Sequence, residues 1–225
     1  MFQPINFLVL LIVGLMGYFI GNISPAILIG KAHGIDIKKE GSGNAGTTNV
    51  LRVLGKKAAI GTLIIDIGKG VVAVMLGRLI GHIYASGIQG MTEERDIAYV
   101  ALSCAMLAGL CVFIGHIWPM AFGFKGGKGV ATAFGVLVAI HPLLGLSCLA
   151  VVAIVALASK MVSLGSICGA IALPLLSMAF QPDFFFTGLI MSIIVIVKHR
   201  QNISRIMRGE ESKLFTKKKK KNDEE

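Results

Sequence analysis

Four long runs of this sequence contain no charged side chain, and they constrain the fold more than any other feature. No Asp, Glu, Lys or Arg occurs in the runs 1–30, 97–124, 129–159 and 161–182. Apolar runs of about 18 residues or more are typical of helices that cross a bilayer. Charged residues make up only 15% of the 225-residue chain, against roughly 25% in an average soluble domain. The sequence therefore predicts a polytopic, all-α membrane protein and excludes an ordinary soluble enzyme or a disordered chain.

Seven apolar segments are expected to form transmembrane helices. They cover residues 5–29, 58–82, 97–118, 129–140, 142–159, 162–180 and 184–198. The fourth and fifth segments come from one charge-free run of 31 residues, which as a single helix would extend ~46 Å against ~30 Å of hydrocarbon. We divide this run at His141-Pro142, because proline disfavours a continuing helix there.

The distribution of basic residues predicts how these helices are oriented. With seven spans, the loops 30–57 and 119–128, the turn near residue 160 and the tail from 198 share one side, and they hold 19 of the 22 Lys and Arg residues. Because cytoplasmic loops are enriched in Lys and Arg, the N-terminus is expected outside and the C-terminus in the cytoplasm. The same rule explains the net charge of +10 without a nucleic-acid partner.

The sequence predicts one membrane domain over residues 1–210 and a Lys-rich, disordered cytoplasmic tail over 211–225. The run Lys217–Lys221 is followed by Asn-Asp-Glu-Glu, a composition typical of disordered segments that associate with anionic lipid. The four cysteines all fall in apolar runs and form no Cys-x-x-Cys pair. Buried, inert thiols are therefore expected rather than disulfides or a zinc site.

Three polar segments lie on the predicted cytoplasmic side, and the first is Gly41–Arg52. It is dense in Gly, Ser, Asn and Thr. Glycine lets backbone N–H groups approach an anion closely, and a helix is expected to begin in this segment. Ser42 and Arg52 add a hydroxyl and a guanidinium that clamps phosphate with two N–H groups. The alternative interpretation is a plain polar connecting loop.

The second polar segment contains His116 and then Lys125-Gly126-Gly127-Lys128-Gly129, directly before an apolar helix. This order predicts free N–H groups and a positive helix end beside a lysine, which favours anion binding. It is not a Walker A loop, because glycine follows Lys128 where that motif needs Ser or Thr. The alternative is a turn whose two lysines follow the positive-inside rule.

The third polar segment, Lys198–Glu210, continues the last span into the cytoplasm. If helical, it places His199, Asn202 and Arg205 on one face. By itself the segment is typical of a basic membrane exit. Together with two phosphate-type loops on the same side, it is interpreted as part of one site.

Inside the second span, Asp66 and Lys69 are spaced i, i+3 and are expected to pair on one helix face. Intramembrane charges are costly and often functional, so the pair either takes part in the site or supports it as a structural ion pair. The acidic residues do not cluster on the side of the glycine-rich loops. Metal catalysis is therefore poorly supported, and no cofactor is expected.

At the three polar segments the sequence resembles the bacterial acyl-phosphate:glycerol-3-phosphate acyltransferases, the PlsY family. The resemblance covers about residues 10–210. Gly41–Arg52 matches the first motif of the family, Gly115–Gly129 its phosphate-binding loop, and His199–Glu210 its third motif. Three such motifs in this order, in a seven-span chain of this size, are highly specific.

The resemblance implies an enzyme of the bacterial plasma membrane whose active site faces the cytoplasm. It would transfer a fatty acyl group from acyl phosphate to the 1-hydroxyl of glycerol 3-phosphate, the first step of phospholipid synthesis. The products would be 1-acyl-glycerol 3-phosphate (lysophosphatidic acid) and phosphate. Its partners would be these substrates, membrane lipid and the soluble enzyme that makes acyl phosphate. The rival function is a membrane transporter for phosphate or a phosphorylated metabolite, although transporters bind near the midplane.

The resemblance also implies roles for individual residues. The catalytic residues are expected to be Ser42, Arg52, Lys128, His199 and Asn202. Substrate binding is expected of Gly41, Gly43, Asn44, Thr48, Asn49, His116, Lys125, Gly126, Gly127, Gly129 and Arg205. Supporting roles are expected of Asp66, Lys69 and Glu210.

Within this set, the amides of Gly126, Gly127 and Gly129, with Lys128, are expected to bind the phosphate of glycerol 3-phosphate. Arg52 and Ser42 would hold the acyl phosphate or the developing oxyanion, while His199 and Asn202 would orient the attacking hydroxyl. The general base is either His199 or a phosphate oxygen of the substrate. The acyl chain is expected to lie between helices.

Overall fold

The computed structural model describes residues 5–88, 91 and 93–213, and every regular element in this part of the chain is helical. In chain order the elements are α1 (Phe7–Gly21), α2 (Pro25–Ala32), α3 (Thr47–Leu54), α4 (Lys56–Ser86), α5 (Glu94–Ile117), η1 (Met120–Phe122), α6 (Val130–Ile140), α7 (Pro142–Ser159), α8 (Val162–Phe180), η2 (Pro182–Phe184), α9 (Phe185–Lys198) and α10 (Arg200–Met207). The all-α prediction is confirmed for these residues. From residue 214 onward the predicted tail, including Lys217–Lys221, lies outside the described residues.

Most of these helices are long and apolar enough to cross a bilayer. Five candidate spans occur in the described residues: Phe7–Ala32, which joins α1 and α2, then α4, Glu94–Phe122, α7 and α8. A sixth candidate joins Pro182–Lys198 to α10 through a bend of 55°, while α6 has only 11 residues. All seven predicted apolar segments thus coincide with helices. The number of spans and their orientation in the bilayer stay predictions.

The expected break at His141-Pro142 is confirmed. α6 ends at Ile140, and Pro142 is the first residue of α7, a position where its missing N–H costs no helical hydrogen bond. The Nδ1 atom of His141 accepts a hydrogen bond from the amide of Leu144 at 3.4 Å and caps α7.

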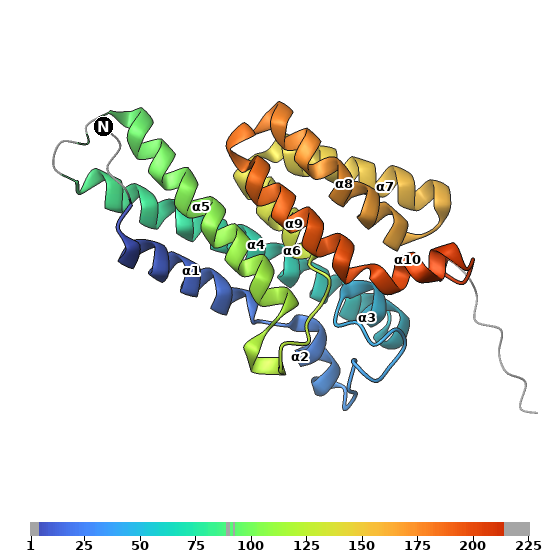
Figure 1. Ribbon diagram of the computed structural model, residues 1–225. Coiled ribbons are helices and arrows are strands. Elements are labelled where there is room, and N and C mark those ends of the chain that lie inside the picture. The colour runs from blue at the N-terminus through green and yellow to red at the C-terminus, as the bar shows by residue number, and fades with distance from the viewer. Residues whose placement is uncertain (1–4, 89–90, 92, 214–225) are drawn as a thin grey trace, which may run out of the picture.

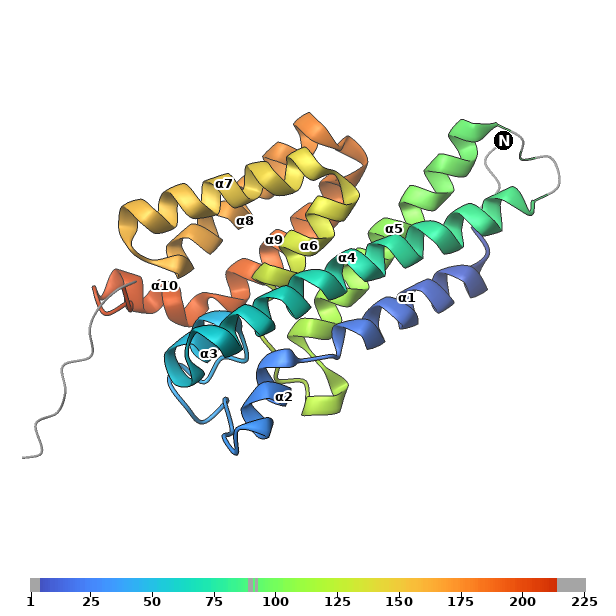
Figure 2. The same ribbon diagram turned by 180° about the vertical axis from the view of Figure 1, so that it is seen from behind.

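The helices form two groups that meet along α4 and α6 (Figures 1 and 2). α1, α4 and α5 pack against one another in the first group, and α6 to α9 form the second. Glycine allows the backbones to approach closely: a Cβ at Gly21 would lie 2.3 Å from the carbonyl oxygen of Val112, and one at Gly135 would lie 2.1 Å from that of Ile67. Such contacts are typical of membrane helices, which associate by close backbone packing.

Apolar side chains cover the outer faces of both groups. Some of the most exposed are Phe7, Ile64, Leu157, Leu175 and Phe186. Apolar exposure spread over so many helices is typical of a surface surrounded by lipid rather than water. The core between the groups is also apolar, and its fully buried members include Phe113, Val136, Leu144, Phe184 and Met191.

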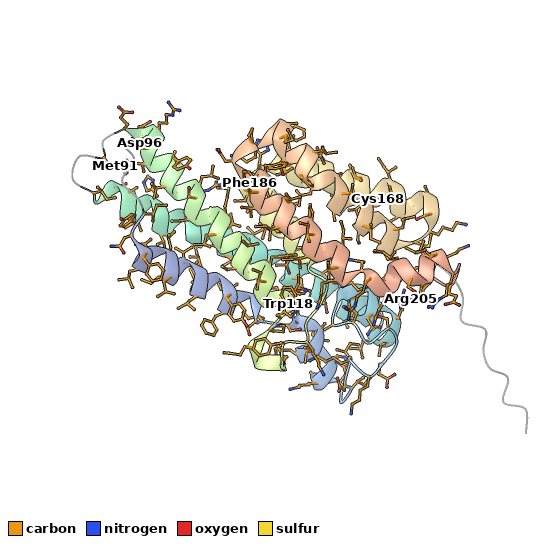
Figure 3. The ribbon with its side chains drawn as sticks, in the orientation of Figure 1. Met91, Asp96, Trp118, Cys168, Phe186 and Arg205 are labelled. Atoms are coloured by element: carbon orange, nitrogen blue, oxygen red, sulfur yellow. The ribbon has the colours of Figure 1, made fainter. Side chains whose placement is uncertain are left out.

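The three polar segments gather at one end of the molecule. The loop between α2 and α3, the loop before α6, and α10 lie together, far from the start of α1 (Figure 1). Trp118 and Arg205 lie toward this end, whereas Met91 and Asp96 lie at the opposite end (Figure 3). The apolar body therefore brings together polar segments that are distant in the sequence.

Candidate active site

The first polar segment folds around one buried asparagine. Asn49, in the first turn of α3, is only 1% exposed. Its Oδ1 atom accepts hydrogen bonds from the amide and hydroxyl of Ser42 at 2.8 and 3.1 Å. Its Nδ2 atom donates to the carbonyl oxygens of Ile37 and Glu40 at 3.1 and 3.0 Å. These four bonds use the whole hydrogen-bonding capacity of the side chain, so Asn49 holds the loop and positions Ser42, and its expected role in substrate binding stays a prediction.

The N-terminus of α3 opens into the same region. Gly46 is the N-cap residue, and its lack of a side chain leaves the helix end without a side-chain cap. The first-turn amides of a helix have no intrahelical acceptor and carry partial positive charge. Thr47 Oγ1 is buried there without a hydrogen-bond partner. With Arg52 on the same helix, this end of α3 is suited to an anion.

The glycine-rich loop before α6 folds back onto the end of α5. The amide of Gly126 donates to the carbonyl oxygen of Ile117 at 3.1 Å, and the amide of Gly127 donates to that of His116 at 3.3 Å. A Cβ at Gly126 would lie 2.0 Å from the His116 carbonyl oxygen, and one at Gly127 would lie 2.3 Å from His116 Nε2. That both amides donate to a substrate phosphate therefore stays a prediction, and it would require both to exchange their acceptors on α5. The two amides are already paired, and both residues are glycine because no side chain fits.

The first turn of α6 supplies the free amides of this segment. Gly129 is its N-cap residue, with φ of 86°, in the left-handed region that glycine adopts readily. Gly129, Val130 and Ala131 all line the cleft described below. Their amides belong to the helix start, where no intrahelical acceptor is available.

Lys128 places a cation directly beside this helix start. Its Nζ atom donates a hydrogen bond to Oδ1 of Asn202, in the third polar segment. Burial lowers the pKa of Lys128 to about 8, while the nearby carboxylate of Glu211 opposes the shift. Lys128 is therefore charged at neutral pH, but the negative charge near it does not fully offset the cost of its burial. A phosphate bound there would favour its charged form.

The third polar segment reaches the cleft through the bend between α9 and α10. His199 lies at this bend and is 3% exposed. Its Nδ1 atom donates to the carbonyl oxygen of Val195 at 2.8 Å. Because a carbonyl oxygen only accepts, the hydrogen sits on Nδ1 and the Nε2 atom of the neutral ring is an acceptor. This tautomer suits a general base or a partner for a substrate hydroxyl.

Glu211 joins the third segment to α8. Its Oε1 atom accepts from Ser163 Oγ and Asn202 Nδ2, and its Oε2 atom accepts from Arg205 Nε, all at 2.7 Å. Burial raises the pKa of Glu211, but the hydrogen bonds from Ser163, Arg205 and Asn202 outweigh it and hold the pKa below its usual value. Asn202 is thus fixed between an ionised carboxylate and Lys128.

The role of Glu211 was missed from the sequence, where Glu210 was expected to support the site and Glu211 to belong to the tail. Glu210 instead forms an exposed ion pair with Arg208, at 2.9 Å. At Gly209 the backbone leaves the helical conformation, with φ of 71°. No periodic pattern therefore indicates which of the two adjacent glutamates turns inward.

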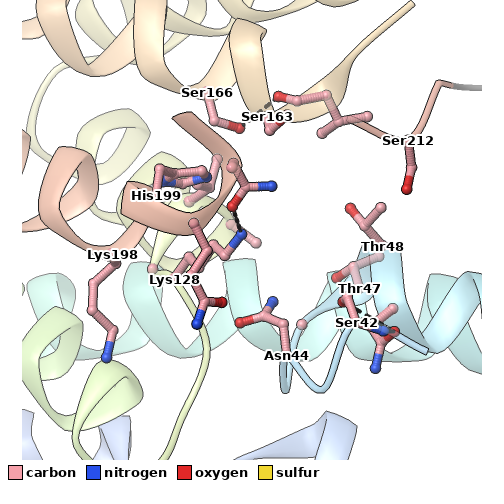
Figure 4. A pocket seen from close by; sticks show the side chains of 18 of the residues that line it. Ser42, Asn44, Thr47, Thr48, Lys128, Ser163, Ser166, Lys198, His199 and Ser212 are labelled. Atoms are coloured by element: carbon pink, nitrogen blue, oxygen red, sulfur yellow. Dashed lines mark hydrogen bonds between the residues drawn. The ribbon is translucent and has the colours of Figure 1, made fainter. Parts of the chain in front are cut away.

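A cleft of about 1670 Å³ unites the three segments (Figure 4). The predicted site residues that line it are Gly41, Ser42, Gly43, Asn44, Thr48, Asn49, Arg52, Asp66, His116, Gly126, Lys128, Gly129, His199, Asn202, Arg205 and Glu210. Lys69, Lys125 and Gly127 are not among its lining residues. Figure 4 shows Lys128 and His199 on one side of the cleft and Thr47 and Thr48 on the other.

The ion pair expected inside the second span is present. Lys69 Nζ lies 2.8 Å from Asp66 Oδ1, and both side chains are buried. Lys69 Nζ also lies 2.8 Å from Nδ1 of His116. Although the His116 ring lines the cleft, this nitrogen is engaged by the lysine and does not face a ligand.

An apolar cavity of about 80 Å³ adjoins the cleft between α6, α7, α8 and α9. Val130, Phe134, Leu149 and Ser166 line both spaces. The polar cleft therefore continues into the apolar body of the protein. Serines in an apolar run give little signal, so neither Ser166 nor Ser163 was singled out from the sequence.

The polar groups of the site are cations, amides, hydroxyls and the imidazoles of His116 and His199. Among the described residues, no group of three or more His, Cys, Asp or Glu side chains is placed to hold a metal ion. Six basic residues line the cleft: Arg52, Lys128, Lys198, Arg200, Arg205 and Lys213. Three of the four carboxylates that line the cleft are themselves paired: Asp66 with Lys69, Glu210 with Arg208, and Glu211 with Arg205.

The fold and the cleft define an integral membrane protein with a cleft lined by basic residues at one end of an apolar helical body. A family model described as glycerol-3-phosphate acyltransferase matches residues 11–209. The glycerol-3-phosphate acyltransferase of Thermoanaerobacter sp. (strain X514) is 43% identical over 203 residues, covering 89% of this chain and 93% of the relative. That of Clostridioides difficile (strain 630) is 39% identical over 210 residues, covering 92% and 97%. This chain belongs to the glycerol-3-phosphate acyltransferase family.

Two crystal structures of PlsY (YgiH), an integral membrane glycerol 3-phosphate acyltransferase, are similar to this structure. The glycerol 3-phosphate form aligns with a TM-score of 0.79 and the lysophosphatidic acid form with 0.76. Each is 31% identical and covers 91% of this chain, which in turn covers 95% and 94% of the two chains. The resemblance to the PlsY family is confirmed.

Proposed function

We propose that this protein transfers a fatty acyl group from acyl phosphate to the 1-hydroxyl of glycerol 3-phosphate. The products are 1-acyl-glycerol 3-phosphate and phosphate, in the first step of phospholipid synthesis. Support for the acceptor and the product comes from the family and from the two PlsY structures in their glycerol 3-phosphate and lysophosphatidic acid forms. The donor is argued from the cleft.

The observation that carries the proposal is the pair of helix starts that line one cleft, each with a basic residue on or beside its helix. Lys128 lies just before α6, and Arg52 lies in the last turn of α3, whose first turn carries Thr47. We assign the first to glycerol 3-phosphate and the second, with Ser42, to the acyl phosphate. A thioester donor has no phosphate beside its reacting carbonyl and would leave the second site without a function.

The chemistry fits a site that positions and stabilises charge. The oxygen of the glycerol hydroxyl forms a bond to the acyl carbonyl carbon, the bond from this carbon to the phosphate oxygen breaks, and phosphate leaves with the electron pair. Either His199 Nε2 or a phosphate oxygen of the donor accepts the hydroxyl proton. Because phosphate is a good leaving group, orientation by Asn202 and charge stabilisation by Arg52 and Lys128 supply the remaining catalysis.

The first part of the acyl chain occupies the apolar cavity that adjoins the cleft, and the rest of the chain extends between the helices toward the bilayer. The walls of this cavity include Leu137, Leu173 and Met191, which are buried in the helical body. The reacting carbonyl then lies near Ser166, where the polar and apolar spaces meet. A chain entering from the bilayer reaches the site without crossing water, which suits an apolar substrate.

In the bacterial plasma membrane, the cleft faces the cytoplasm and the N-terminus lies outside, with α6 as the short member of seven spans. A soluble enzyme that makes acyl phosphate supplies the donor at this face. Exposed Lys39 at the polar end and exposed Glu94 at the other end allow a test. In intact cells, a membrane-impermeant thiol reagent should label Glu94→Cys and not Lys39→Cys. The reverse pattern contradicts the orientation.

The decisive experiment supplies the purified protein with labelled glycerol 3-phosphate and three donors in parallel. These donors are palmitoyl phosphate, palmitoyl-CoA and palmitoyl carrier protein, each with and without a chelator. Lysophosphatidic acid from palmitoyl phosphate alone, with or without chelator, is the expected result, and Lys128→Ala should abolish it in folded protein. Product from a thioester alone overturns the donor assignment. No product from any donor, with counterflow of glycerol 3-phosphate in sealed vesicles, would instead favour the transporter.

A further inference from the structure

A buried polar cluster lies beneath the glycine-rich loop, and the proposed reaction does not use it. Lys69 Nζ is 2.8 Å from both Asp66 Oδ1 and His116 Nδ1. It also donates to the carbonyl oxygens of Gly21 at 3.3 Å and Ile23 at 2.7 Å. Asp66, Lys69 and His116 are 1, 5 and 4% exposed. A buried ammonium is costly unless it is paired and hydrogen-bonded, and here four acceptors surround it.

These acceptors come from three elements. Gly21 and Ile23 flank the break between α1 and α2, Asp66 belongs to α4 as Lys69 does, and His116 lies near the end of α5. One side chain therefore fixes the broken end of the first helix and the end of α5 onto α4. The cluster is a junction between elements and not an isolated i, i+3 pair.

His116 connects this junction to the glycine-rich loop. Its carbonyl oxygen accepts the amide of Gly127 at 3.3 Å. On its ring, Nε2 is so close that a Cβ at Gly127 would lie 2.3 Å away. Any movement of the His116 ring or backbone is therefore transmitted to Gly127, and Lys128 is the next residue.

The break between α1 and α2 holds the other end of the loop. The hydroxyl of Tyr18 donates to the carbonyl oxygen of Trp118 at 2.9 Å, and the amide of Ala121 donates to Oδ1 of Asn22 at 3.2 Å. The segment that leads from α5 to Lys128 is thus attached, at its start and at its end, to the elements that Lys69 joins.

We propose that Lys69 is a positioning residue for acyl transfer. Through His116 and the α1–α2 break, it sets the place of Lys128 and of the start of α6, although Lys69 itself does not line the cleft. The inference rests on the proposed function in one respect, which is the binding of the glycerol 3-phosphate at the start of α6.

The test compares Lys69→Met with the double variant Asp66→Asn/Lys69→Met. Both lose the hydrogen bonds to the carbonyl oxygens and to His116, but only the single variant leaves a buried carboxylate without its ammonium partner, with His116 Nδ1 at 3.2 Å from Asp66 Oδ1 as its remaining polar neighbour. We expect the single variant to be less stable to heat and the double variant to regain much of that stability. In both, the KM for glycerol 3-phosphate should rise about tenfold or more, as for loss of a hydrogen bond to a buried charge, while the KM for palmitoyl phosphate stays unchanged.

Arg78→Met is the matched control. Arg78 lies on the same helix, and its Nη2 atom donates to the carbonyl oxygens of Ala139 and Ile140 at the other end of α6. This variant should lose stability without a change in the KM for glycerol 3-phosphate. A rise in that KM equal to the rise in the Lys69 variants would mean that general loosening is responsible, and would overturn the proposal.

Two further results would overturn the positioning role. One is an unchanged KM for glycerol 3-phosphate in folded Lys69→Met. The other is a double variant in which both the stability and the KM return to normal, because the role of Lys69 would then be only to neutralise Asp66. Absence of turnover in the unmodified protein refutes the proposed function separately. In that case, calorimetric binding of glycerol 3-phosphate to the same variants still tests the positioning of Lys128.

Discussion

The two glycine-rich segments beside the cleft look alike in sequence but are held in place by different means. In the segment before α3, Gly41 and Gly43 have φ of 59° and 69°, a conformation that costs other residues roughly 1–2 kcal/mol. The buried side chain of Asn49 then closes this turn with four hydrogen bonds. The conformation of this loop therefore depends on the backbone freedom of two glycines and on the hydrogen bonds of one side chain, that of Asn49.

The loop before α6 is held by close packing against another helix. Gly126 and Gly127 lie so near the end of α5 that a Cβ at either position would be 2.0 or 2.3 Å from His116. Neither residue has a positive φ, although Gly129 after them does. Glycine is thus needed in the first loop for its positive φ and in the second for its close packing against α5. The same substitution should therefore have different effects in the two loops.

The largest effect is expected from Gly126→Ala. The added methyl group meets the carbonyl oxygen of His116 and a ring carbon of Pro119, and backbone atoms cannot move aside as a flexible side chain does. The loop must shift and carry Lys128 with it. We expect kcat/KM for glycerol 3-phosphate to fall by about 100-fold or more, a loss of about 2.7 kcal/mol in transition-state stabilisation. Steady-state kinetics in detergent provide the measurement.

Gly68→Ala is the control for this substitution. Gly68 lies inside α4 with nothing within 4 Å of its added Cβ. Activity should stay unchanged and stability should rise by roughly 0.5–1 kcal/mol, because alanine is favoured over glycine inside a helix. Equal losses in Gly68→Ala and Gly126→Ala would contradict the packing argument.

The second effect is expected from Asn49→Ala, which removes the tether of the other loop. The amide of Ser42 and the carbonyl oxygens of Ile37 and Glu40 lose their partner, at a cost of about 2–3 kcal/mol in stability. Because Ser42 and the start of α3 are assigned to the donor, kcat/KM for palmitoyl phosphate should fall more than KM for glycerol 3-phosphate rises. Thermal unfolding and kinetics with each substrate varied give both quantities.

Asn49→Asp separates the two halves of this tether. The carboxylate keeps the acceptor facing Ser42 but loses the donor that faces Ile37 and Glu40. Its stability should lie below that of Asn49→Ala, because a buried carboxylate oxygen then faces the carbonyl oxygens of Ile37 and Glu40. A fully stable Asn49→Ala would show that the loop does not depend on this side chain.

The sequence predicted features that arise from local spacing. The apolar runs, four of them free of charge, gave all seven apolar helices, Pro142 gave the break between α6 and α7, and the i, i+3 spacing of Asp66 and Lys69 gave their ion pair. Each depends on residues within a few turns of one another, where helical geometry is nearly invariant.

Other features depend on contacts between distant elements and were not predictable in this way. The amides of Gly126 and Gly127 were expected to bind a ligand, but α5 accepts both. Glu211 was placed in the tail, yet it binds Ser163 on α8, which is 48 positions away. A glycine in the sequence does not show which element packs against it, and a glutamate after the end of a helix does not show which way its side chain turns.

The third effect is a difference in pH dependence between the two loops. The cation of the first loop is the guanidinium of Arg52, whereas that of the second is Lys128, and burial lowers the pKa of Lys128 to about 8. A lysine is charged below its pKa, so phosphate binding at α6 should weaken as pH rises through about 8. We expect kcat/KM for glycerol 3-phosphate to be about tenfold lower at pH 9 than on its plateau, since this quantity reports the free enzyme. A Lys128→Arg variant should lack this decline, and a decline that persists in the variant belongs to another group.

The smallest effect is expected from asparagine in place of Gly43. Its φ of 69° is a conformation that asparagine tolerates better than other non-glycine residues. The nearest atom to an added Cβ is the Lys38 carbonyl oxygen at 3.0 Å, so a small adjustment is sufficient. We expect kcat/KM to fall by less than about fivefold, which is under 1 kcal/mol. Gly127→Asn should lose far more activity in the same assay, because its Cβ would lie 2.3 Å from His116 Nε2 and 2.8 Å from the Ala45 carbonyl oxygen. If both variants lose activity equally, the two loops do not differ in the way that their geometry indicates.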